Sequence, residues 1–596
     1  MRHPIIVATA ALACGVSWAM AQTAGTPARK PDWGVNFWAH AFYTGDAVFV
    51  DVTKVFDYDL PRDFTDELRK DPRKWSRLRL SAQGVPLDGK PELRSLLGGY
   101  PDGIYKLRHE GKGQVRFAGA ASIVEGSVRR KDGMTMADVR VDRAKQKLVR
   151  MAFRDVDPKD PVRNVRLVCP GYDPDAKRIV REEFIRRTRP FSTFRFMDWG
   201  ATNSSRAGKW SERRPADFLV QTPAFGPRLP MGGMAWELLI DIANECGKDI
   251  WLCVPHLADD DYVRELARLT RDRLRANSRC LIELSNELWN FSQGPELGQK
   301  MIAPDWSWQN KHGVEMYYGA VAPRLMQIAA IFRAEWGPKA KGRLEFVLAG
   351  QVGNPWHVAK SLEYFKDRKI NPRDVIDTIS VAPYIHPAGK HLDLDSLMAA
   401  QMKVVDEALA EARRGVPGKD ARSRLYRGVK RHKELADAHG LKLNAYEGGQ
   451  HVWHNRVTDG KLIGACQKDP RMRELYRKYF ELWERTCPGD LFVHYTYSSG
   501  SWGLLPNTAS PGSPKWDAVV SCLLPAGDCT LDGKVTYEDF QVLREHFGKD
   551  GTWWEQGDFT GDGEVGRADL SLMRKHLTGL TAEQAKTVRD LASEDK

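Results

Sequence analysis

Short apolar runs that alternate with longer helical patterns constrain the fold of this 596-residue chain more than any other feature. Segments between the runs, such as 259–277 and 471–486, carry Leu, Tyr and Phe at helical spacing. Strands that alternate with helices imply parallel βαβ units, so an α/β fold with a (β/α)₈ barrel is predicted over residues 166–520. The runs are NVRLVCPG (164–171), FSTFRFMDW (191–199), DIWLCVPH (249–256), CLIELSNELWN (280–290), LEFVLAGQ (344–351), DTISVAPYIHP (377–387), KLNAYEGGQ (442–450) and LFVHYTY (491–497).

A different pattern precedes the barrel. Residues 80–165 alternate apolar and polar side chains between Gly, Asp and Lys turns, which is typical of antiparallel strands with one wet face. We therefore predict a β-rich module there. A strand-like segment, DWGVNFWAH, also opens the region 32–60 and can supply the first barrel strand. The module would then be inserted after that strand, and NVRLVCPG would resume the barrel or form its edge.

The N-terminus has the pattern of a secretory signal peptide over residues 1–21. Arg2 and His3 precede an apolar run, and small residues stand at Ala19 and Ala21. No later apolar run is long enough to span a bilayer, so a secreted or cell-surface protein is expected. The sequence ALAC (11–14) loosely resembles a lipoprotein box, which leaves a lipid anchor as the less favoured alternative.

The cysteine count and the net charge bear on the redox compartment and on the kind of partner. Removal of residues 1–21 takes away Cys14 and leaves an even number of cysteines, which allows disulfides in an oxidising compartment; Cys522 with Cys529 and Cys466 with Cys487 are plausible pairs. The formal net charge is +12, but Lys and Arg are scattered among 78 acidic residues and no nucleic-acid motif occurs. A sulfated or uronic-acid polysaccharide fits this charge better than a nucleic acid does.

The last seventy residues contain one loop–helix pattern written twice, at 527–548 and 557–579. Each copy places oxygen-bearing groups at positions 1, 3, 5, 7 and 12 of a calcium loop, with Gly533 or Gly563 at the sharp turn. The predicted ligands are Asp528, Thr530, Asp532, the carbonyl of Lys534, and Asp539 in the first loop, and Asp558, Thr560, Asp562, Glu564 and Asp569 in the second.

Over residues 526–580 this repeat resembles type I dockerins. The resemblance implies Ca²⁺ as the bound cofactor and a cohesin-type protein as the partner. Thr stands at position 3, where dockerins usually have Asn or Asp, and Asp closes each loop, as is normal for dockerins.

Polar residues end most of the predicted barrel strands, and barrel sites form at those carboxyl ends. Two of them, Glu287 and Glu447, are carboxylates that would face each other across the barrel mouth, which is what glycosidic cleavage requires. The others are Arg195, Asp198 and Trp199 after the second strand, His256 after the third, Asn286 at the fourth, Tyr384 and His386 after the sixth, and Trp502 beyond the eighth.

Over residues 165–505 this arrangement resembles clan A of the retaining glycoside hydrolases. The resemblance implies that Glu287 is the acid/base and Glu447 the nucleophile, with no cofactor for catalysis. It also implies that Asn286 bonds the sugar 2-hydroxyl, that Arg195 lies beside the nucleophile, that Tyr384 or His386 bonds it from strand six, and that Trp502 is an aromatic floor. The stretches STFRFMDWGATNSS and IELSNELWN resemble secreted bacterial proteins of uncharacterised activity, so this resemblance does not imply a particular substrate.

The two-carboxylate mechanism predicts a division of ionisation. Burial and the charge of Glu447 should keep Glu287 protonated, whereas Glu447 should stay ionised beside Arg195 and a Tyr hydroxyl. The rings of Trp199, Trp289, Trp356 and Trp453 are candidates for stacking on sugar faces or for packing. For His256 and His386 we expect hydrogen bonds to substrate, because no zinc motif accompanies them.

The favoured hypothesis is a secreted hydrolase that cleaves β-glycosidic bonds of a polysaccharide. The alternatives are a non-catalytic carbohydrate-binding protein and a structural cell-surface component with a dockerin module. Both carboxylates at matching strand ends favour the enzyme, because a binding protein has no need of two.

Overall fold

The computed structural model describes residues 32–38, 47–175, 177–222, 231–290, 318–452, 457 and 459–593. The predicted signal peptide and Trp453 lie outside these residues. No helix of the described chain combines the length and the apolar character needed to cross a membrane.

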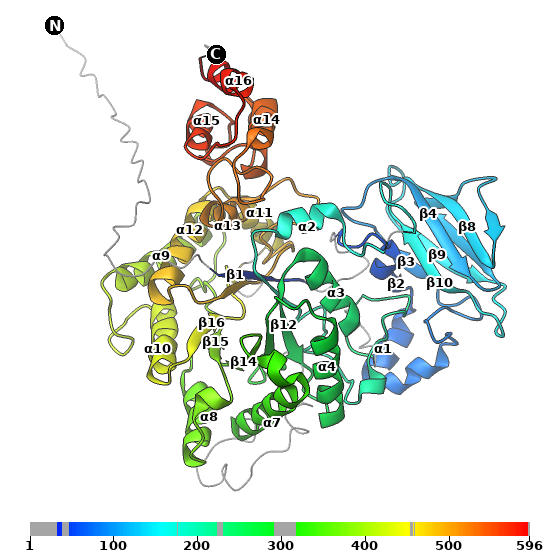
Figure 1. Ribbon diagram of the computed structural model, residues 1–596, viewed down its shortest axis with the longest axis horizontal. Helices are drawn as coiled ribbons and strands as arrows, with labels where there is room; N and C mark the ends of the chain where they lie inside the picture. Colours follow the sequence, from blue (N-terminus) through cyan, green and yellow to red (C-terminus); the bar gives the residue numbers. More distant parts are fainter. Residues whose placement is uncertain are drawn as a thin grey trace. The chain divides into compact units, whose positions relative to one another are not determined.

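Within the described residues, eight parallel strands form a closed barrel, which confirms the predicted (β/α)₈ fold (Figure 1). The pairing of β12 with β13 runs from Ile250 opposite Cys280 to Val254 opposite Leu284. With this register both strands end at the same edge of the barrel. Asn286 and Glu287 follow the end of β13 at that edge. The strands in barrel order are β1 (Trp33–Asn36), β11 (Thr193–Arg195), β12 (Asp249–Val254), β13 (Cys280–Leu284), β14 (Leu344–Ala349), β15 (Thr378–Val381), β16 (Lys442–Ala445) and β17 (Phe492–His494).

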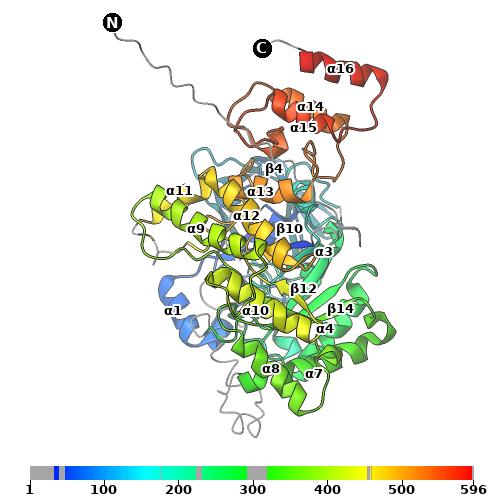
Figure 2. The ribbon, with the colours of Figure 1, turned by 90° about the vertical axis from the view of Figure 1, so that its left-hand side faces the viewer.

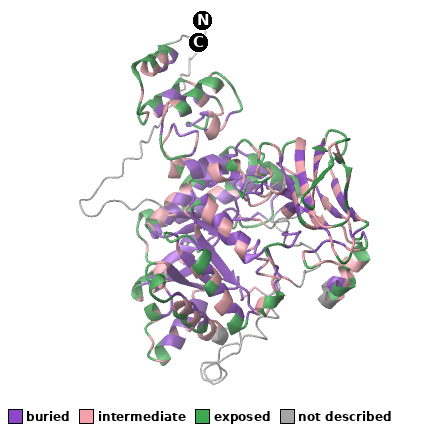
Figure 3. Ribbon diagram, turned by 45° about the vertical axis from the view of Figure 1, so that its right-hand side comes forward, coloured by how far each residue is buried: buried purple, intermediate pink, exposed green. Residues whose placement is uncertain are grey.

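Helices cover the outside of the barrel, whose strands are buried (purple in Figure 3). Helix α4 (Asp260–Arg273) illustrates why a helix forms at this point in the sequence. The Asp259 side chain accepts a hydrogen bond from the Tyr262 backbone N–H, two further Asp residues occupy the first turn, and one face is buried. Helices α9 and α12 pack along each other (Figure 2). The helices are α2 (Glu182–Thr188), α3 (Trp236–Cys246), α4 (Asp260–Arg273), α7 (Tyr318–Trp336), α8 (Trp356–Asp367), α9 (Leu394–Arg413), α10 (Arg424–Ala438), α11 (Gly460–Lys468), α12 (Arg471–Thr486) and α13 (Pro514–Leu523).

A β-rich module is inserted between β1 and β11 as two antiparallel sheets. One sheet has the order β10-β4-β8-β6, with β7 paired to β8, and the other has the order β2-β3-β9-β5. Helix α1 (Arg62–Lys70) lies between β2 and β3 in the sequence. The strands are β2 (Asp57–Tyr58), β3 (Leu93–Ser95), β4 (Gly103–Glu110), β5 (Gln114–Gly119), β6 (Ala121–Ile123), β7 (Arg129–Lys131), β8 (Met134–Val141), β9 (Val149–Arg154) and β10 (Arg163–Val168).

The prediction for NVRLVCPG is wrong. This run forms most of β10, which pairs antiparallel with β4 and so belongs to the module rather than to the barrel. Its alternating burial, with Val165 and Leu167 inside and Asn164 outside, is that of a one-sided antiparallel strand. The apolar content of the run therefore does not indicate which sheet it joins, whereas the alternation within it does.

The duplicated C-terminal segment folds as two loops, each followed by a helix. Helix α14 (Tyr537–His546) follows the first loop and α15 (Arg567–Arg574) follows the second; α16 (Ala582–Ser593) comes last. Phe540 and Leu543 of the first helix are buried, as are Leu570 and Met573 of the second. The repeat in the sequence is thus a repeat in the fold.

The eight cysteines of the described chain are free thiols, so the pairs suggested for Cys466 with Cys487 and for Cys522 with Cys529 are not formed. Cys466 lies within α11, where its sulfur accepts a hydrogen bond from Gln401 Nε2 at 3.3 Å and contacts the Met398 sulfur at 3.7 Å. It fills the core as a small apolar residue does.

Candidate active site

The chain that follows β13 leaves the strand in an uncommon backbone conformation. Ser285 and Glu287 have φ values of 57° and 41°, in the left-handed region that non-glycine residues rarely adopt. The Ser285 N–H donates to the Val254 carbonyl at 2.8 Å, and the Asn290 N–H donates to the Glu287 carbonyl at 2.7 Å. Backbone strain of this kind costs about 1–3 kcal/mol per residue and gathers at functional sites.

Glu287 lines a large cavity at this edge of the barrel. Its Oε1 accepts a hydrogen bond from the Tyr446 hydroxyl at 2.8 Å, and its Oε2 accepts one from Asn290 Nδ2 at 3.0 Å. Because Tyr446 immediately precedes Glu447, the end of β16 positions both candidate carboxylates.

Glu447 lines the same cavity and is 5% exposed. Its Oε1 accepts a hydrogen bond from Arg195 Nη1 at 2.9 Å, and its Oε2 accepts one from the Tyr384 hydroxyl at 2.8 Å. Burial raises the pKa of Glu447 to about 8; the Arg195 charge opposes this rise and the Glu287 charge adds to it. Burial thus opposes the ionisation of Glu447 that the sequence predicts, whereas its two donors, Arg195 and Tyr384, favour it.

Arg195 lies fully buried beneath Glu447 and does not line the cavity. Besides Glu447, its guanidinium donates to Glu283, to Asn36 Oδ1 at 3.2 Å and to Asn286 Oδ1 at 2.8 Å. The sequence predicted that Arg195 lies beside Glu447, and its guanidinium does donate to Glu447. We also predicted that Arg195 binds substrate, but it does not line the cavity and so has a supporting position. Asn286 does line the cavity, and its Nδ2 donates to Asn203 Oδ1 at 3.1 Å, so its amide is held at both ends.

Four more of the predicted residues line the cavity: Asp198, Tyr384, His386 and Trp502. Asp198 accepts a hydrogen bond from the Tyr495 hydroxyl at 2.9 Å, and burial raises its pKa to about 6. The Trp502 ring stacks on Trp38, with ring centres 5.3 Å apart and planes 26° apart. These rings provide an apolar surface of the kind on which sugars stack.

Trp199 and His256 do not line the cavity, so the hydrogen bond to substrate predicted for His256 is not supported, and Trp199 packs rather than offering its ring to a sugar. Trp199 is fully buried; it stacks on Phe37 with ring centres 4.5 Å apart, and its Nε1 donates to the Trp38 carbonyl at 2.9 Å. His256 is 6% exposed, and its Nδ1 lies 3.3 Å from the Ser285 hydroxyl. Both residues support neighbours that do reach the cavity or its edge, because strand-end side chains alternate between the mouth and the surrounding packing.

The cavity has a volume of about 1360 Å³. Trp289 lines it as well, whereas Trp356 is 42% exposed and does not. The sequence pattern missed several lining residues, although adjacency to Glu447 could have indicated Tyr446 and the first strand could have indicated Trp38. The missed lining residues include Trp38, Asn203, Ser204, Gln351, Glu407, Arg422, Arg424, Tyr446, His451 and Tyr495.

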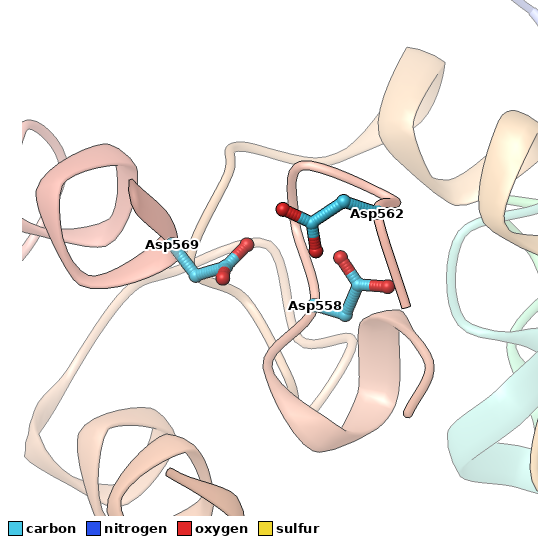
Figure 4. Close-up of side chains that lie close together, drawn as sticks. All are labelled: Asp558, Asp562 and Asp569. Carbon is cyan, nitrogen blue, oxygen red and sulfur yellow. The ribbon is translucent and has the colours of Figure 1, made fainter. Parts of the chain in front are cut away.

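In the second C-terminal loop, Asp558, Asp562 and Asp569 direct their carboxylates toward one point (Figure 4). One oxygen from each lies within 4.8 Å of the others, which fits a cation held by oxygen ligands. The residues of the first loop form no comparable group within the described chain. There, Asp528 accepts backbone N–H bonds from Asp532 at 3.1 Å and Gly533 at 2.7 Å.

No protein-family model matches the chain, and no curated protein matches it. Among solved structures, the GH51 arabinofuranosidase from Xanthomonas axonopodis pv. citri is 9% identical, with a TM-score of 0.34 over 56% of this chain and 64% of that one. The chain thus spans less than two thirds of that protein's length. The CBM22-1 and GH10 modules of Clostridium thermocellum endo-1,4-beta-D-xylanase 10B are 8% identical, with a TM-score of 0.33 over 74% of this chain and 90% of that one. CelM2, a bifunctional glucanase-xylanase from a metagenome library, is 9% identical, with a TM-score of 0.35 over 59% and 76%.

Proposed function

We propose that this protein is a retaining glycoside hydrolase that cleaves β-glycosidic bonds of a polysaccharide. One observation carries the proposal: Glu287 and Glu447 line one cavity, and each carboxylate accepts a hydrogen bond from a different tyrosine. Hydrolysis of a glycosidic bond needs two such carboxyl groups, one as acid and one as nucleophile or base. The cavity volume, about 1360 Å³, is ample for a chain of several sugars.

In the proposed reaction, Glu287 donates its proton to the leaving glycosidic oxygen while ionised Glu447 attacks the anomeric carbon. The C–O bond to the leaving group breaks, and a covalent glycosyl–enzyme ester forms on Glu447. Glu287, now a carboxylate, then takes a proton from water, and the resulting hydroxide displaces Glu447 with overall retention. Tyr384 and Arg195 orient Glu447, and Tyr446 orients Glu287.

Hydrolysis of a polysaccharide panel tests the assignment. Wild type, Glu287→Gln and Glu447→Gln are compared by release of reducing ends, and ¹H NMR identifies the first-formed anomer. Each Gln variant should lose activity by roughly 10³-fold or more, because it removes a group that acts in the transition state. Glu345→Gln is the matched control, because Glu345 is also a buried barrel carboxyl but lies near the start of β14. Full activity in both site variants would exclude the assignment, and an inverted first anomer would exclude retention.

A second candidate is a non-catalytic carbohydrate-binding protein. It is favoured by the raised pKa of Glu447, near 8, because a protonated carboxyl group cannot attack at neutral pH. The same panel separates the two functions when it is run from pH 6 to pH 9.5. Binding without released reducing ends across that range would establish the second candidate.

We also propose that the C-terminal repeat is a dockerin-like calcium module with a cohesin-type partner, and that residues 1–21 direct export. The converging carboxylates of Asp558, Asp562 and Asp569 support the calcium site. Calorimetry with Ca²⁺ should show binding that Asp528→Ala combined with Asp558→Ala removes. An absence of heat in the wild-type protein would end this proposal.

A further inference from the structure

A third carboxyl group lies under the candidate pair. Glu283 is on β13, four residues before Glu287, and is 1% exposed. It does not line the cavity, so it cannot meet substrate. A carboxylate in such a place is costly unless its surroundings satisfy it, and its contacts therefore indicate its role.

Several donors converge on a single oxygen of Glu283. Its Oε2 accepts hydrogen bonds from Arg195 Nε at 3.1 Å and Nη2 at 2.9 Å, and from Trp251 Nε1 at 2.9 Å. The Cys253 sulfur lies 3.5 Å from the same oxygen. The other oxygen, Oε1, is buried and has no hydrogen-bond partner among the described residues. Donors of this kind, two of them from a guanidinium, favour the ionised carboxylate.

Arg195 makes fewer hydrogen bonds to Glu447 than to Glu283. The guanidinium donates two N–H bonds to Glu283 and one, from Nη1, to Glu447. One positive charge thus serves two buried carboxyl groups, and ionising both would leave an uncompensated negative charge in a dry site. The group with fewer charged donors, Glu447, is the one that retains a proton.

We propose that Glu283 is a positioning residue that holds the Arg195 guanidinium under Glu447 and, by taking two of its hydrogen bonds where Glu447 takes one, sets the pH at which Glu447 ionises. The consequence for catalysis rests on the proposed function. The ionisation itself is a property of the free protein and can be measured without a substrate.

The other groups around the pair do not replace Arg195. Tyr384 donates to Glu447, whereas the carboxyl groups of Glu287 and Asp198 oppose its ionisation. Burial raises the pKa of Glu283, and Arg195, Trp251 and Cys253 oppose that rise; of these three only Arg195 is a cation. Burial raises the pKa of the Tyr446 hydroxyl, and the charges of Glu287, Glu447 and Glu283 add to that rise. Arg195 is therefore the cation that these groups share.

Glu283→Gln is the natural test because it keeps the shape. The amide oxygen can take the place of Oε2 and accept the same donors, and the amide nitrogen falls where Oε1 has no partner. The variant removes one negative charge and leaves Glu447 as the sole counter-ion of Arg195. The pKa of Glu447 should then fall by roughly 1–3 units, the size of an arginine's effect on a nearby carboxyl group.

The measurement is a ¹³C NMR titration of the full chain with labelled glutamate carboxyl groups, in which Glu447→Gln identifies the Glu447 signal. In Glu283→Gln, the Glu447 midpoint should move down by the stated amount. Glu345→Gln should leave it unmoved, although Glu345 also pairs with an arginine, Arg279, at 3.1 Å. An unmoved midpoint in folded Glu283→Gln would overturn the inference. So would a Glu283 signal in the wild type that titrates at a higher pH than the Glu447 signal, a result that does not depend on how the Glu283 variant folds.

Kinetics then separate this inference from the proposed function. With an active substrate, the acid limb of kcat/KM should move to lower pH in Glu283→Gln by the same amount as the NMR midpoint. A merely structural role would lower kcat without moving the limb, and that result would overturn the inference while hydrolysis stood. A shifted NMR midpoint in a protein that hydrolyses nothing would overturn the proposed function and leave the role of Glu283 in place.

Discussion

The barrel mouth and the second C-terminal loop both gather carboxylates, but they do so by opposite means. At the mouth, Arg195 and Glu447 lie 252 residues apart in sequence and meet in the interior at 2.9 Å. In the loop, Asp558 and Asp569 belong to one short segment, and backbone N–H groups of that segment, such as Gly563 at 2.9 Å from Asp558, hold them. The mouth is organised by side chains that compensate one another, whereas the loop leaves its negative charge for a cation to neutralise.

The two sites therefore have different structural requirements. The mouth depends on the whole barrel, and its charges are desolvated before any ligand arrives. The loop depends on residue spacing within one short segment and, under the proposed function, on a bound ion. Changes to a charge should therefore affect folding and rate at the mouth, but mainly ion affinity at the loop.

The largest expected effect follows from removing the shared cation. Arg195→Met should lower the free energy of unfolding by about 3–5 kcal/mol, because Glu283 and Glu447 would both lose their buried partner. Urea unfolding measures it. Arg413→Met is the control, since Arg413 pairs with Glu481 but is 54% exposed, and its change should stay within about 1 kcal/mol. Equal losses in the two variants would remove the contrast between buried and exposed charge.

The pH dependence of hydrolysis comes next. Glu447 must be ionised to attack, and burial raises its pKa to about 8, so kcat/KM should rise with pH on the acid side of that value. Between pH 8 and pH 6 the loss should be roughly 50-fold, because about half of Glu447 is ionised at a pH equal to its pKa and about 1% two units below it. A flat profile down to pH 5 would show that Glu447 is ionised throughout, as the sequence had suggested.

A smaller effect is expected from Tyr446→Phe, which removes the hydroxyl that bonds Glu287 at 2.8 Å. A hydrogen bond to a charged group contributes about 1.5–3 kcal/mol, so kcat should fall roughly 10- to 100-fold with the fold intact. Tyr426→Phe is a matched control, because the Tyr426 hydroxyl bonds the Val416 carbonyl at 2.8 Å and does not line the cavity. Comparable kcat losses in both would assign the effect to stability rather than to Glu287.

The smallest effect concerns the two calcium loops. Asp562→Asn should weaken Ca²⁺ binding about tenfold, because it removes one charge from the converging group. Asp532→Asn, the same change in the first loop, should matter less, since no such group forms there within the described chain. Calorimetry on the full chain measures both. A larger loss from Asp532→Asn would reverse the order of the two loops.

Much of the architecture was predictable from local pattern. The alternation of strand and helix segments indicated the barrel, and the polar residues after each run placed Asn286, Glu287, Tyr384 and Glu447 at one edge. This works because parallel strands in a closed barrel must all end on the same side. The failures at Trp199 and His256 have one cause: a residue at a strand end can turn toward the mouth or into the packing, and residue type does not decide which.

The sequence by itself determined the repeat with its twelve-residue loop spacing, and the placement of Glu287 and Glu447 just after two barrel strands, because strand periodicity and loop spacing are local properties. Tertiary structure alone decided that β10 joins the inserted module, that Arg195 is shared between Glu283 and Glu447, and that burial raises the pKa of Glu447. Those outcomes depend on which distant side chains come into contact and on how much water they exclude. The spacing of residues along the chain specifies neither.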